Sequence, residues 1–410
     1  MTARDSQPDD RAPVLYLTHR VPFPPDKGDR IRNFHLLRQL ARRGPVWLGC
    51  LADEPTPQAT LDALGGLCER VAVVPVRSRW RWVNAGLSLL TGRSLSEGLF
   101  SEGGLRRVIR SWTGETRFRA AVVSASSLVP YLRRDWLESV PAVVDLVDVD
   151  SQKWLDFAAA SRPPRRWLYR LEARRVRKLE SGLPRWTRAV SVVSRAEADT
   201  YDSFAGPGSA IVASNGVDLD YFAPSGAATT LSCAFVGAMD YLPNIDGAVW
   251  FAREVWPRIR QQYPTAEYRV VGRKPAPVVE ALAALPGVVV TRSVPDVRPF
   301  VASAAVVVAP LRLARGVQNK VLEALAMGKP VVAAPPALAG LGTKPGTDLL
   351  AAATPAEFAD AVCTLIADPA RRQELGAAGR HYVERHHHWE HCLEPLLERI
   401  YAPHTRDRLT

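Results

Sequence analysis

The fold is decided by Gly316-Val317-Gln318-Asn319-Lys320-Val321-Leu322-Glu323-Ala324-Leu325-Ala326-Met327-Gly328-Lys329-Pro330-Val331-Val332. We predict a helix over residues 318–327 and a strand over 330–334, joined by a Gly-x-Pro turn. The first backbone N–H groups of such a helix have no partner inside it, so they can bind a phosphate. Lys320 and Glu323 lie three residues apart and are therefore neighbours on the helix surface. The plainer interpretation is a Lys–Glu pair on an amphipathic helix with a glycine C-cap.

Apolar runs alternate with longer amphipathic segments along most of the chain, which predicts parallel sheets with helices on both faces. The pattern restarts after a loop-like segment, 223–228, that is typical of a linker. We therefore predict an α/β protein with two tandem Rossmann-like, doubly wound domains, at residues 12–225 and 229–384. Ligands of such sheets bind beyond the carboxyl ends of the strands, so a cleft faced by both domains is the expected site. The remaining predicted strands are 14–18, 46–51, 71–76, 120–124, 142–146, 189–193, 210–213, 231–236, 268–271, 288–290 and 306–309, and the remaining helices are 30–42, 167–183, 195–204, 244–263 and 277–285.

Three loops follow predicted strands and supply further candidates. In the first domain, Gly28 can let the backbone approach a ligand just before a helix, although a plain strand–helix loop capped by Asp29 fits equally well. In the second domain, Gly237 directly follows one strand, and Arg273 and Lys274 follow the next. Two adjacent cations at a strand end suit a diphosphate, whereas a solvated basic loop is the alternative. The GxGxxG fingerprint of dinucleotide binding is absent.

The bulk properties favour an anionic partner. The chain has 410 residues and a formal net charge of +11, which fits binding to nucleic acid, an acidic membrane surface or a phosphorylated substrate. Its five cysteines are scattered and form no CxxC, so a reducing compartment is expected. No signal-peptide pattern and no apolar run of about 20 residues is found, which predicts a cytoplasmic protein.

The opening stretch resembles the donor-site signature of glycosyltransferase family 4, which has the GT-B fold. Other segments agree with it in order and spacing. The entry strand of the second domain is similar at 235–237, and paired motifs closing the first domain are similar at 191–194 and 215–218. Residues 383–401 resemble the terminal helix of the family, so we expect a helix at 385–402 that crosses back to the first domain. The resemblance covers nearly the whole chain.

Three shorter motifs narrow the resemblance. Residues 18–30, 145–151 and 239–244 are similar to sugar transferases of bacterial PEP-CTERM/exosortase systems, which are tied to exopolysaccharide gene clusters. One departure concerns the Glu-x7-Glu motif of the family, because Arg315 stands where its first glutamate is expected. The contacts to the donor sugar are therefore expected to differ.

The resemblance implies sugar transfer from a nucleotide diphosphate sugar with retention at the anomeric carbon. It assigns donor binding to the helix start and to the ribose-accepting glutamate: Gly316, Val317, Gln318, Asn319 and Glu323, with Gly28 and Gly237. Arg273, Lys274 and Lys320 are expected to neutralise the leaving diphosphate, so no metal and no cofactor is implied. Asp148 or Asp150 can steer the acceptor hydroxyl, and a cap role at the following helix is the alternative. A cluster of histidines around 381–391 is expected to belong to the terminal helix rather than to a metal site.

Basic residues interleave with tryptophans in one segment, where Arg79, Trp80, Arg81 and Trp82 follow each other. A second basic segment covers 162–188. One interpretation is that these segments are solvated helix faces. The other is that they dock the protein on an anionic membrane or bind its lipid-linked glycan acceptor there. Nucleic acid binding is not expected, since no recognised module is present.

Two functions from other classes are also compatible with the sequence. A nucleotide-sugar epimerase has a similar architecture and would interconvert free nucleotide sugars without an acceptor. A non-catalytic nucleotide-binding or membrane-docking protein is the other, because Arg315 replaces a residue of the family motif.

Overall fold

The computed structural model describes residues 12–26, 28–76, 78–133 and 135–403, with the backbone only for 78–80. The chain divides into two compact units. Unit 1 comprises Met1–Ala213 and Leu393–Thr410, and unit 2 comprises Ser214–Cys392. The boundary between Ala213 and Ser214 lies before the predicted linker 223–228, so this linker belongs to unit 2.

Unit 1 is built on a seven-stranded sheet in which every pair of neighbours is parallel. The strand order is β3-β2-β1-β4-β5-β6-β7, so the direction of winding reverses between β1 and β4. Both of these strands are buried along their whole length, as expected for the centre of a parallel sheet. The strands are β1 (Val14–Thr18), β2 (Val46–Ala52), β3 (Arg70–Pro75), β4 (Ala120–Ser124), β5 (Ala142–Val147), β6 (Ala189–Val192) and β7 (Ile211–Val212).

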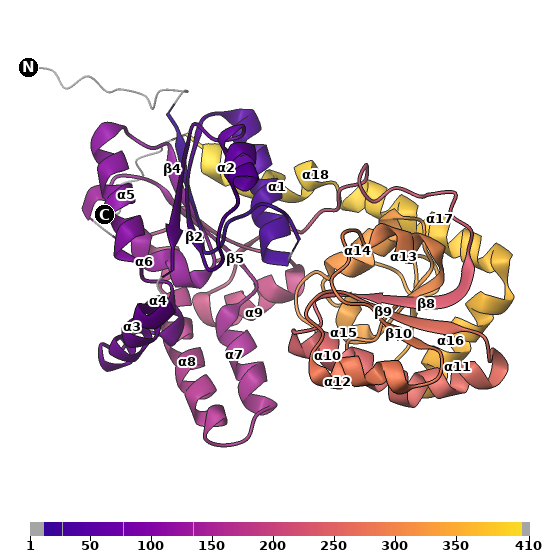
Figure 1. The fold of residues 1–410 in the computed structure, drawn as a ribbon. Helices are drawn as coiled ribbons and strands as arrows, with labels where there is room; N and C mark the ends of the chain where they lie inside the picture. Colours follow the sequence, from indigo (N-terminus) through magenta and orange to yellow (C-terminus); the bar gives the residue numbers. More distant parts are fainter. Residues whose placement is uncertain (1–11, 27, 77, 134, 404–410) are drawn as a thin grey trace, which may run out of the picture. The chain divides into compact units, whose positions relative to one another are not determined.

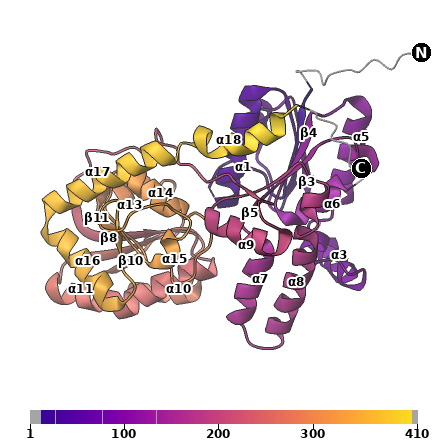
Figure 2. The same cartoon turned by 180° about the vertical axis from the view of Figure 1, so that it is seen from behind.

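Helices cover both faces of this sheet, with α1 and α2 on one side and α5 and α6 on the other (Figures 1 and 2). The last helix, α18 (Trp389–Tyr401), begins in unit 2 and ends in unit 1. Within unit 1, Tyr401 donates a hydrogen bond to the Leu40 carbonyl and Glu394 pairs with Arg43. The other helices are α1 (Gly28–Arg43), α2 (Gln58–Gly65), α3 (Ser78–Leu90), α4 (Leu95–Leu99), α5 (Gly103–Glu115), α6 (Val129–Leu132), α7 (Asp150–Ala159), α8 (Arg165–Glu180) and α9 (Arg195–Ala205).

A charged pair lies in the core of unit 1. The Arg32 guanidinium donates two hydrogen bonds to the Asp145 carboxylate, at 2.7 and 2.9 Å, and both side chains are fully buried. Ser191 donates a third hydrogen bond to the same carboxylate. The pair thereby ties α1 to the end of β5 and to β6, and the bidentate geometry offsets the desolvation of both charges.

Unit 2 has a six-stranded parallel sheet in the order β10-β9-β8-β11-β12-β13. Its winding reverses between β8 and β11. The strands are β8 (Thr230–Val236), β9 (Glu267–Val271), β10 (Val288–Val290), β11 (Ala304–Ala309), β12 (Val331–Ala333) and β13 (Leu350–Ala351), and the α-helices are α10 (Leu242–Trp250), α11 (Trp256–Gln262), α12 (Pro277–Glu280), α13 (Arg298–Ser303), α14 (Asn319–Ala326), α15 (Pro335–Leu338), α16 (Pro355–Ala367) and α17 (Pro369–His386). Both units are thus doubly wound α/β folds, as predicted.

Two predicted helices are interrupted. The helix expected over 244–263 is divided by a π-helical segment, Phe251–Val255, because Pro257 has no N–H for the carbonyl one turn earlier. The terminal helix expected over 385–402 is two helices, α17 and α18, which break at His387 and His388. At the break the His387 carbonyl accepts a hydrogen bond from the backbone N–H of Val217 at 2.8 Å, which diverts the chain from the helix.

Candidate functional site

The winding of unit 2 reverses between β8 and β11, and such a reversal opens a crevice at the carboxyl ends of the strands. Two loops meet there. One leads from β8 through Gly237 to α10, and the other leads from β11 through Gly316 to α14. The residues that the sequence singled out in the second domain occupy these loops and the neighbouring end of β9.

The start of α14 is shaped by two glycines. Gly316 has a φ of 61°, which favours glycine. A Cβ atom on Gly340 would lie 2.2 Å from the Gly316 carbonyl oxygen, so only a glycine fits against this loop. Gln318 is the N-cap residue, and its side-chain amide donates to the Arg315 carbonyl instead of capping the helix. The N–H groups of the first turn are therefore not capped by the N-cap side chain.

Lys320 reaches across the crevice from α14. Its ammonium nitrogen lies 2.5 Å from the Asn244 Oδ1 atom, which comes from the first turn of α10. The same nitrogen lies 5.3 Å from the centre of the Phe235 ring, within the range of a cation–π contact. One charged side chain thus joins the loop after β8 to the loop after β11.

Asn244 is held by the backbone around it. It is buried, and its Nδ2 atom donates to the Ala238 carbonyl at 2.9 Å. A Cβ atom on Gly237 would lie 2.8 Å from this Nδ2 atom, and one on Gly272 would lie 1.7 Å from the Gly237 carbonyl oxygen. The two glycines therefore allow the ends of β8 and β9 to approach each other and the Asn244 amide.

Arg273 and Lys274 follow β9 beside these glycines. The Arg273 carbonyl accepts a hydrogen bond from the Met239 N–H at 3.0 Å, which fixes the β9 loop against the β8 loop. Lys274 is exposed and has a φ of 50°, an uncommon conformation for a residue with a side chain. Both bases therefore stand at the edge of the crevice that Lys320 crosses.

Burial shifts the pKa values of the two ionisable side chains of α14. It lowers the pKa of the Lys320 ammonium to about 8, although the nearby Glu323 carboxylate opposes this change. It raises the pKa of Glu323 to about 7, and Lys320 opposes that change in turn. Among the residues that the structure describes, no hydrogen-bond donor reaches the Glu323 carboxylate. It can therefore accept hydrogen bonds from a ligand.

A second contact steadies the first residue of α14. The Asn319 Oδ1 atom accepts a hydrogen bond from the Asn215 side chain at 3.0 Å. The Asn215 carbonyl lies 2.8 Å from the Nδ1 atom of the buried His387 ring. Asn215, at the beginning of unit 2, thus connects the break between α17 and α18 to the helix start.

The other predicted residues belong to unit 1. Gly28 is exposed at the first position of α1, and Asp29 does not cap this helix. Its carboxylate contacts His19 at 3.2 Å and Arg20 at 2.9 Å. Burial alone would raise the pKa of Asp29, but these two partners outweigh it and hold the pKa well below its usual range.

Asp148 lies in the turn between β5 and α7. Its N–H donates to the Leu146 carbonyl, and the preceding Val147 has a φ of 69°. The N-cap residue of α7 is Val149, whose side chain makes no cap hydrogen bond. Carboxylates from elsewhere bond to the helix start instead, because Glu197 accepts from the Val149 N–H and Glu180 from the Ser151 N–H.

The basic and aromatic residues predicted for docking lie on α3. Trp82 has 67% of its surface exposed, and the Arg81 guanidinium lies 5.7 Å from its ring centre. The side chains of Arg79 and Trp80 lie outside the described part of the structure. No described helix is long and apolar enough to span a membrane. No group of three or more His, Cys, Asp or Glu residues in the described ranges is arranged to hold a metal ion.

Asn244 and Asn215 were not among the residues assigned to the site from sequence. The signal for Asn244 was a polar residue in the first turn of a predicted helix, directly after a proline and close to Gly237. Nothing in the linear pattern indicated that its amide would meet Lys320, which is 76 residues further along the chain.

Two Rossmann-like units, the second with a polar crevice at its point of reversal, define the GT-B fold class. Residues 230–368 match the model of a family described as Glycosyl transferases group 1, and the matched residues run from β8 to α16 and include the crevice. No curated protein sequence matches the chain.

Solved structures share the fold over nearly the whole chain. Sucrose-phosphate synthase from Thermosynechococcus elongatus has a TM-score of 0.70 and 16% identity, covering 96% of this chain and 100% of that one. Anabaena HepE, solved in complex with UDP-glucose, has a TM-score of 0.68 and 15% identity, covering 95% and 99%. WaaG, a glycosyltransferase involved in lipopolysaccharide biosynthesis, has a TM-score of 0.66 and 14% identity, covering 95% and 100%.

Proposed function

We propose that the protein is a retaining glycosyltransferase of family 4 type, which moves a sugar from a nucleotide diphosphate sugar to a lipid-linked glycan acceptor. The observation that carries this proposal is the contact between Lys320 and Asn244 across the crevice of unit 2. The contact places a cation between two loops whose backbone can approach a diphosphate. The family match over 230–368 covers the same residues.

Each part of the donor has a candidate partner. The diphosphate would bind the N–H groups at the start of α14 and the charge of Lys320, with Arg273 and Lys274 at the rim. Glu323, one turn further along α14, would accept hydrogen bonds from the ribose hydroxyls. Because these cations can neutralise the departing diphosphate, the proposed reaction uses no metal and no cofactor. Asp148 of unit 1 is the proposed acceptor-side residue.

Exopolysaccharide or cell-surface polysaccharide biosynthesis is the proposed setting, in a system of the PEP-CTERM/exosortase kind. The basic and aromatic residues of α3 would bring the enzyme to the cytoplasmic face of a membrane, where lipid-linked acceptors are found. UDP-glucose is the first donor to test, since HepE was solved with it.

A thermal-shift screen across UDP-, GDP-, ADP- and dTDP-sugars tests donor binding, because a specific ligand raises the apparent melting temperature by mass action. We expect sugars of one nucleotide to stabilise the wild-type protein and not the Lys320→Ala variant. The selected donor is then incubated with lipid extract, and the linkage formed is analysed by NMR. An α-linkage formed from an α-linked donor supports retention.

Two outcomes contradict the proposal. Interconversion of the free nucleotide sugar without an acceptor would identify an epimerase. Donor binding without transfer to any lipid or glycan fraction would identify a non-catalytic nucleotide-binding protein.

A further inference from the structure

The exposed apolar side chains of unit 1 are concentrated on two helices. In the described part of this unit, every large apolar residue that is exposed belongs to α3 or α8. The most exposed are Leu90, at 84%, Trp82, at 67%, and Trp167, at 64%. The others are Val83 and Leu87 on α3 and Leu168 and Leu171 on α8. Such a concentration marks an interaction surface rather than scattered surface residues.

The two helices form one surface. Figures 1 and 2 both show α3 beside α8. The Arg175 guanidinium of α8 donates hydrogen bonds to the Leu89 carbonyl at 2.9 Å and to the Arg93 carbonyl at 2.7 Å. Leu171 precedes Arg175 by one helical turn and Leu90 follows Leu89, so the exposed apolar groups of the two helices adjoin at this contact.

The surface is basic and its acids are turned inward. Five bases on or just before α8 are exposed: Arg162, Arg165, Arg170, Arg174 and Lys178. The two glutamates of α8 are buried, and Glu172 accepts hydrogen bonds from the Leu95 and Ser96 N–H groups of α4. Helix α3 contains no acidic residue. Positive charge around exposed leucine and tryptophan side chains complements an anionic lipid surface.

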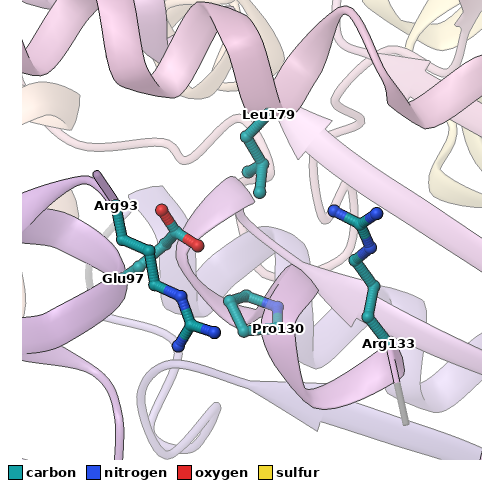
Figure 3. A pocket seen from close by; sticks show the side chains of 5 residues that line it. All are labelled: Arg93, Glu97, Pro130, Arg133 and Leu179. Atoms are coloured by element: carbon teal, nitrogen blue, oxygen red, sulfur yellow. The ribbon is translucent and has the colours of Figure 1, made fainter. Parts of the chain in front are cut away.

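A pocket opens beside this surface. It has a volume of about 250 Å³ and is lined by Arg93, Glu97, Pro130, Arg133 and Leu179 of α8. Figure 3 shows Arg93 and Glu97 on one side and Arg133 on the other. A second pocket shares Arg93, Glu97 and Pro130 with the first and is also lined by Leu87 of α3 and by Arg106. Helix α8 therefore contributes to the first pocket and helix α3 to the second.

The charges in the pocket favour a phosphate. The Glu97 carboxylate is used in a capping box, where it accepts from the N–H of Ser94 at 2.8 Å. Among the described residues, no carboxylate forms an ion pair with Arg93 or Arg133. Two guanidinium groups facing one opening can bind a phosphate by charge-assisted hydrogen bonds.

We propose that α3 and α8 dock on an anionic membrane, and that the arginine pocket beside them takes the phosphate of a lipid headgroup. This inference depends on the proposed function for its purpose, since a lipid-linked acceptor must be reached at a membrane. The exposed leucines favour lipid over nucleic acid, because aliphatic side chains neither stack on bases nor bond to a phosphate backbone.

Sedimentation with vesicles tests the docking surface. We expect the full-length protein to bind phosphatidylcholine vesicles containing 30% phosphatidylglycerol at least tenfold more tightly than phosphatidylcholine alone, because each base near an anionic surface contributes about a fivefold gain. Leu90→Glu combined with Trp167→Glu should reduce this binding at least tenfold. Val278→Glu, which changes an exposed apolar residue of unit 2, is the matched control and should bind like wild type.

A second comparison tests the pocket. Vesicles with phosphatidic acid present a terminal phosphate, whereas vesicles with phosphatidylserine of equal charge do not. We expect a preference for phosphatidic acid that Arg93→Gln/Arg133→Gln abolishes and that Arg292→Gln, at an exposed arginine of unit 2, retains. Equal binding of both lipids, or a preference that the double variant keeps, would overturn the pocket assignment.

Three results would overturn the docking surface. The protein could bind neutral vesicles as tightly as anionic ones, or the Leu90→Glu/Trp167→Glu variant could bind anionic vesicles like wild type. The third is that the protein binds duplex RNA more tightly than anionic vesicles and that the same variant loses this RNA binding. Failure of the proposed function is distinguishable from these. The docking variants should keep the donor-induced thermal shift, and Lys320→Ala should keep vesicle binding.

Discussion

The Lys320 ammonium lies 2.5 Å from the Asn244 Oδ1 atom, and this contact joins the two loops at the point where the sheet of unit 2 reverses its winding. Asn244 is buried and its amide is fixed by the Ala238 carbonyl. The ammonium is therefore held in one place before any ligand arrives. A prepositioned cation loses little conformational entropy on binding a diphosphate, which is the advantage that this arrangement offers.

Removing the Asn244 amide should release Lys320. A hydrogen bond to a charged group contributes about 1.5–3 kcal/mol, so we expect Asn244→Ala to lower kcat/KM for the donor about 10- to 100-fold. Steady-state kinetics at varied donor concentration measures this change. Gln261→Ala, which removes an exposed amide from helix α11 of the same unit, is the matched control and should leave donor kinetics unchanged. Unchanged donor kinetics in Asn244→Ala would mean that the contact has no part in donor use.

The pH dependence of donor use should have two limbs. Burial raises the pKa of Glu323 to about 7, so the carboxylate that we propose to bind the ribose forms only as the pH rises through 7. Burial lowers the pKa of Lys320 to about 8, so the ammonium that we propose to bind the diphosphate is lost as the pH rises through 8. We expect kcat/KM for the donor to be greatest between pH 7 and 8. Because Lys320 and Glu323 interact, the two apparent pKa values of this profile belong to the pair and not to either residue alone.

Single variants assign the limbs of this profile. Lys320→Arg keeps its charge at all these pH values and should extend the alkaline limb. Glu323→Gln should flatten the acid limb and raise KM for the donor. A profile that keeps both limbs in both variants would show that other groups titrate.

The buried pair in unit 1 should matter for stability. Arg32→Leu leaves the Asp145 carboxylate buried without its charged partner, so we expect a loss of about 3–5 kcal/mol in the free energy of unfolding. The Arg32→Leu/Asp145→Leu double variant should lose less than Arg32→Leu, since no charge then remains buried. Urea denaturation of the three proteins measures both quantities. A double variant at least as unstable as Arg32→Leu would contradict this reasoning.

Glu180 predicts a second pH dependence, in stability rather than activity. Burial, with a contribution from Asp150, raises its pKa to about 8 from an ordinary value of 4.5. The folded state therefore binds more protons than the unfolded state between these values, and this contribution to stability is lost as the pH rises from 4.5 through 8. The melting temperature should fall across this range, and Glu180→Gln should reduce the fall. An identical decline in the variant would exclude Glu180 as its source.

Local pattern was sufficient for every described strand except β13, but for fewer of the helices. Fully apolar strands such as β1 and β11 and the helix start at α14 follow from residue periodicity, turn residues and the Gly-x-Pro signal. The helices that were missed include α2, α3, α5, α7, α16 and most of α17, and the two-residue strand β13 was missed as well. The break at His387 was missed because it depends on a backbone hydrogen bond to Val217, which lies 170 residues earlier in the chain.

The candidate site was predictable only in part, for the same reason. Lys320 and Glu323 share one helix, so their spacing alone made them neighbours. Asn244 and Asn215 become part of the site through contacts with α14 that the sheet order creates. The joint surface of α3 and α8 likewise requires the contact made by Arg175.

We propose above all that unit 2 holds a nucleotide diphosphate sugar at the crevice crossed by Lys320. Isothermal titration calorimetry with the donor selected by thermal shift tests it most directly, on wild type, Lys320→Ala, Glu323→Ala and the exposed-lysine control Lys344→Ala. We predict that the control binds like wild type and that the two site variants bind at least tenfold more weakly with unchanged melting temperatures in the absence of donor. Wild-type affinity in Lys320→Ala and Glu323→Ala would place the donor elsewhere and contradict the account.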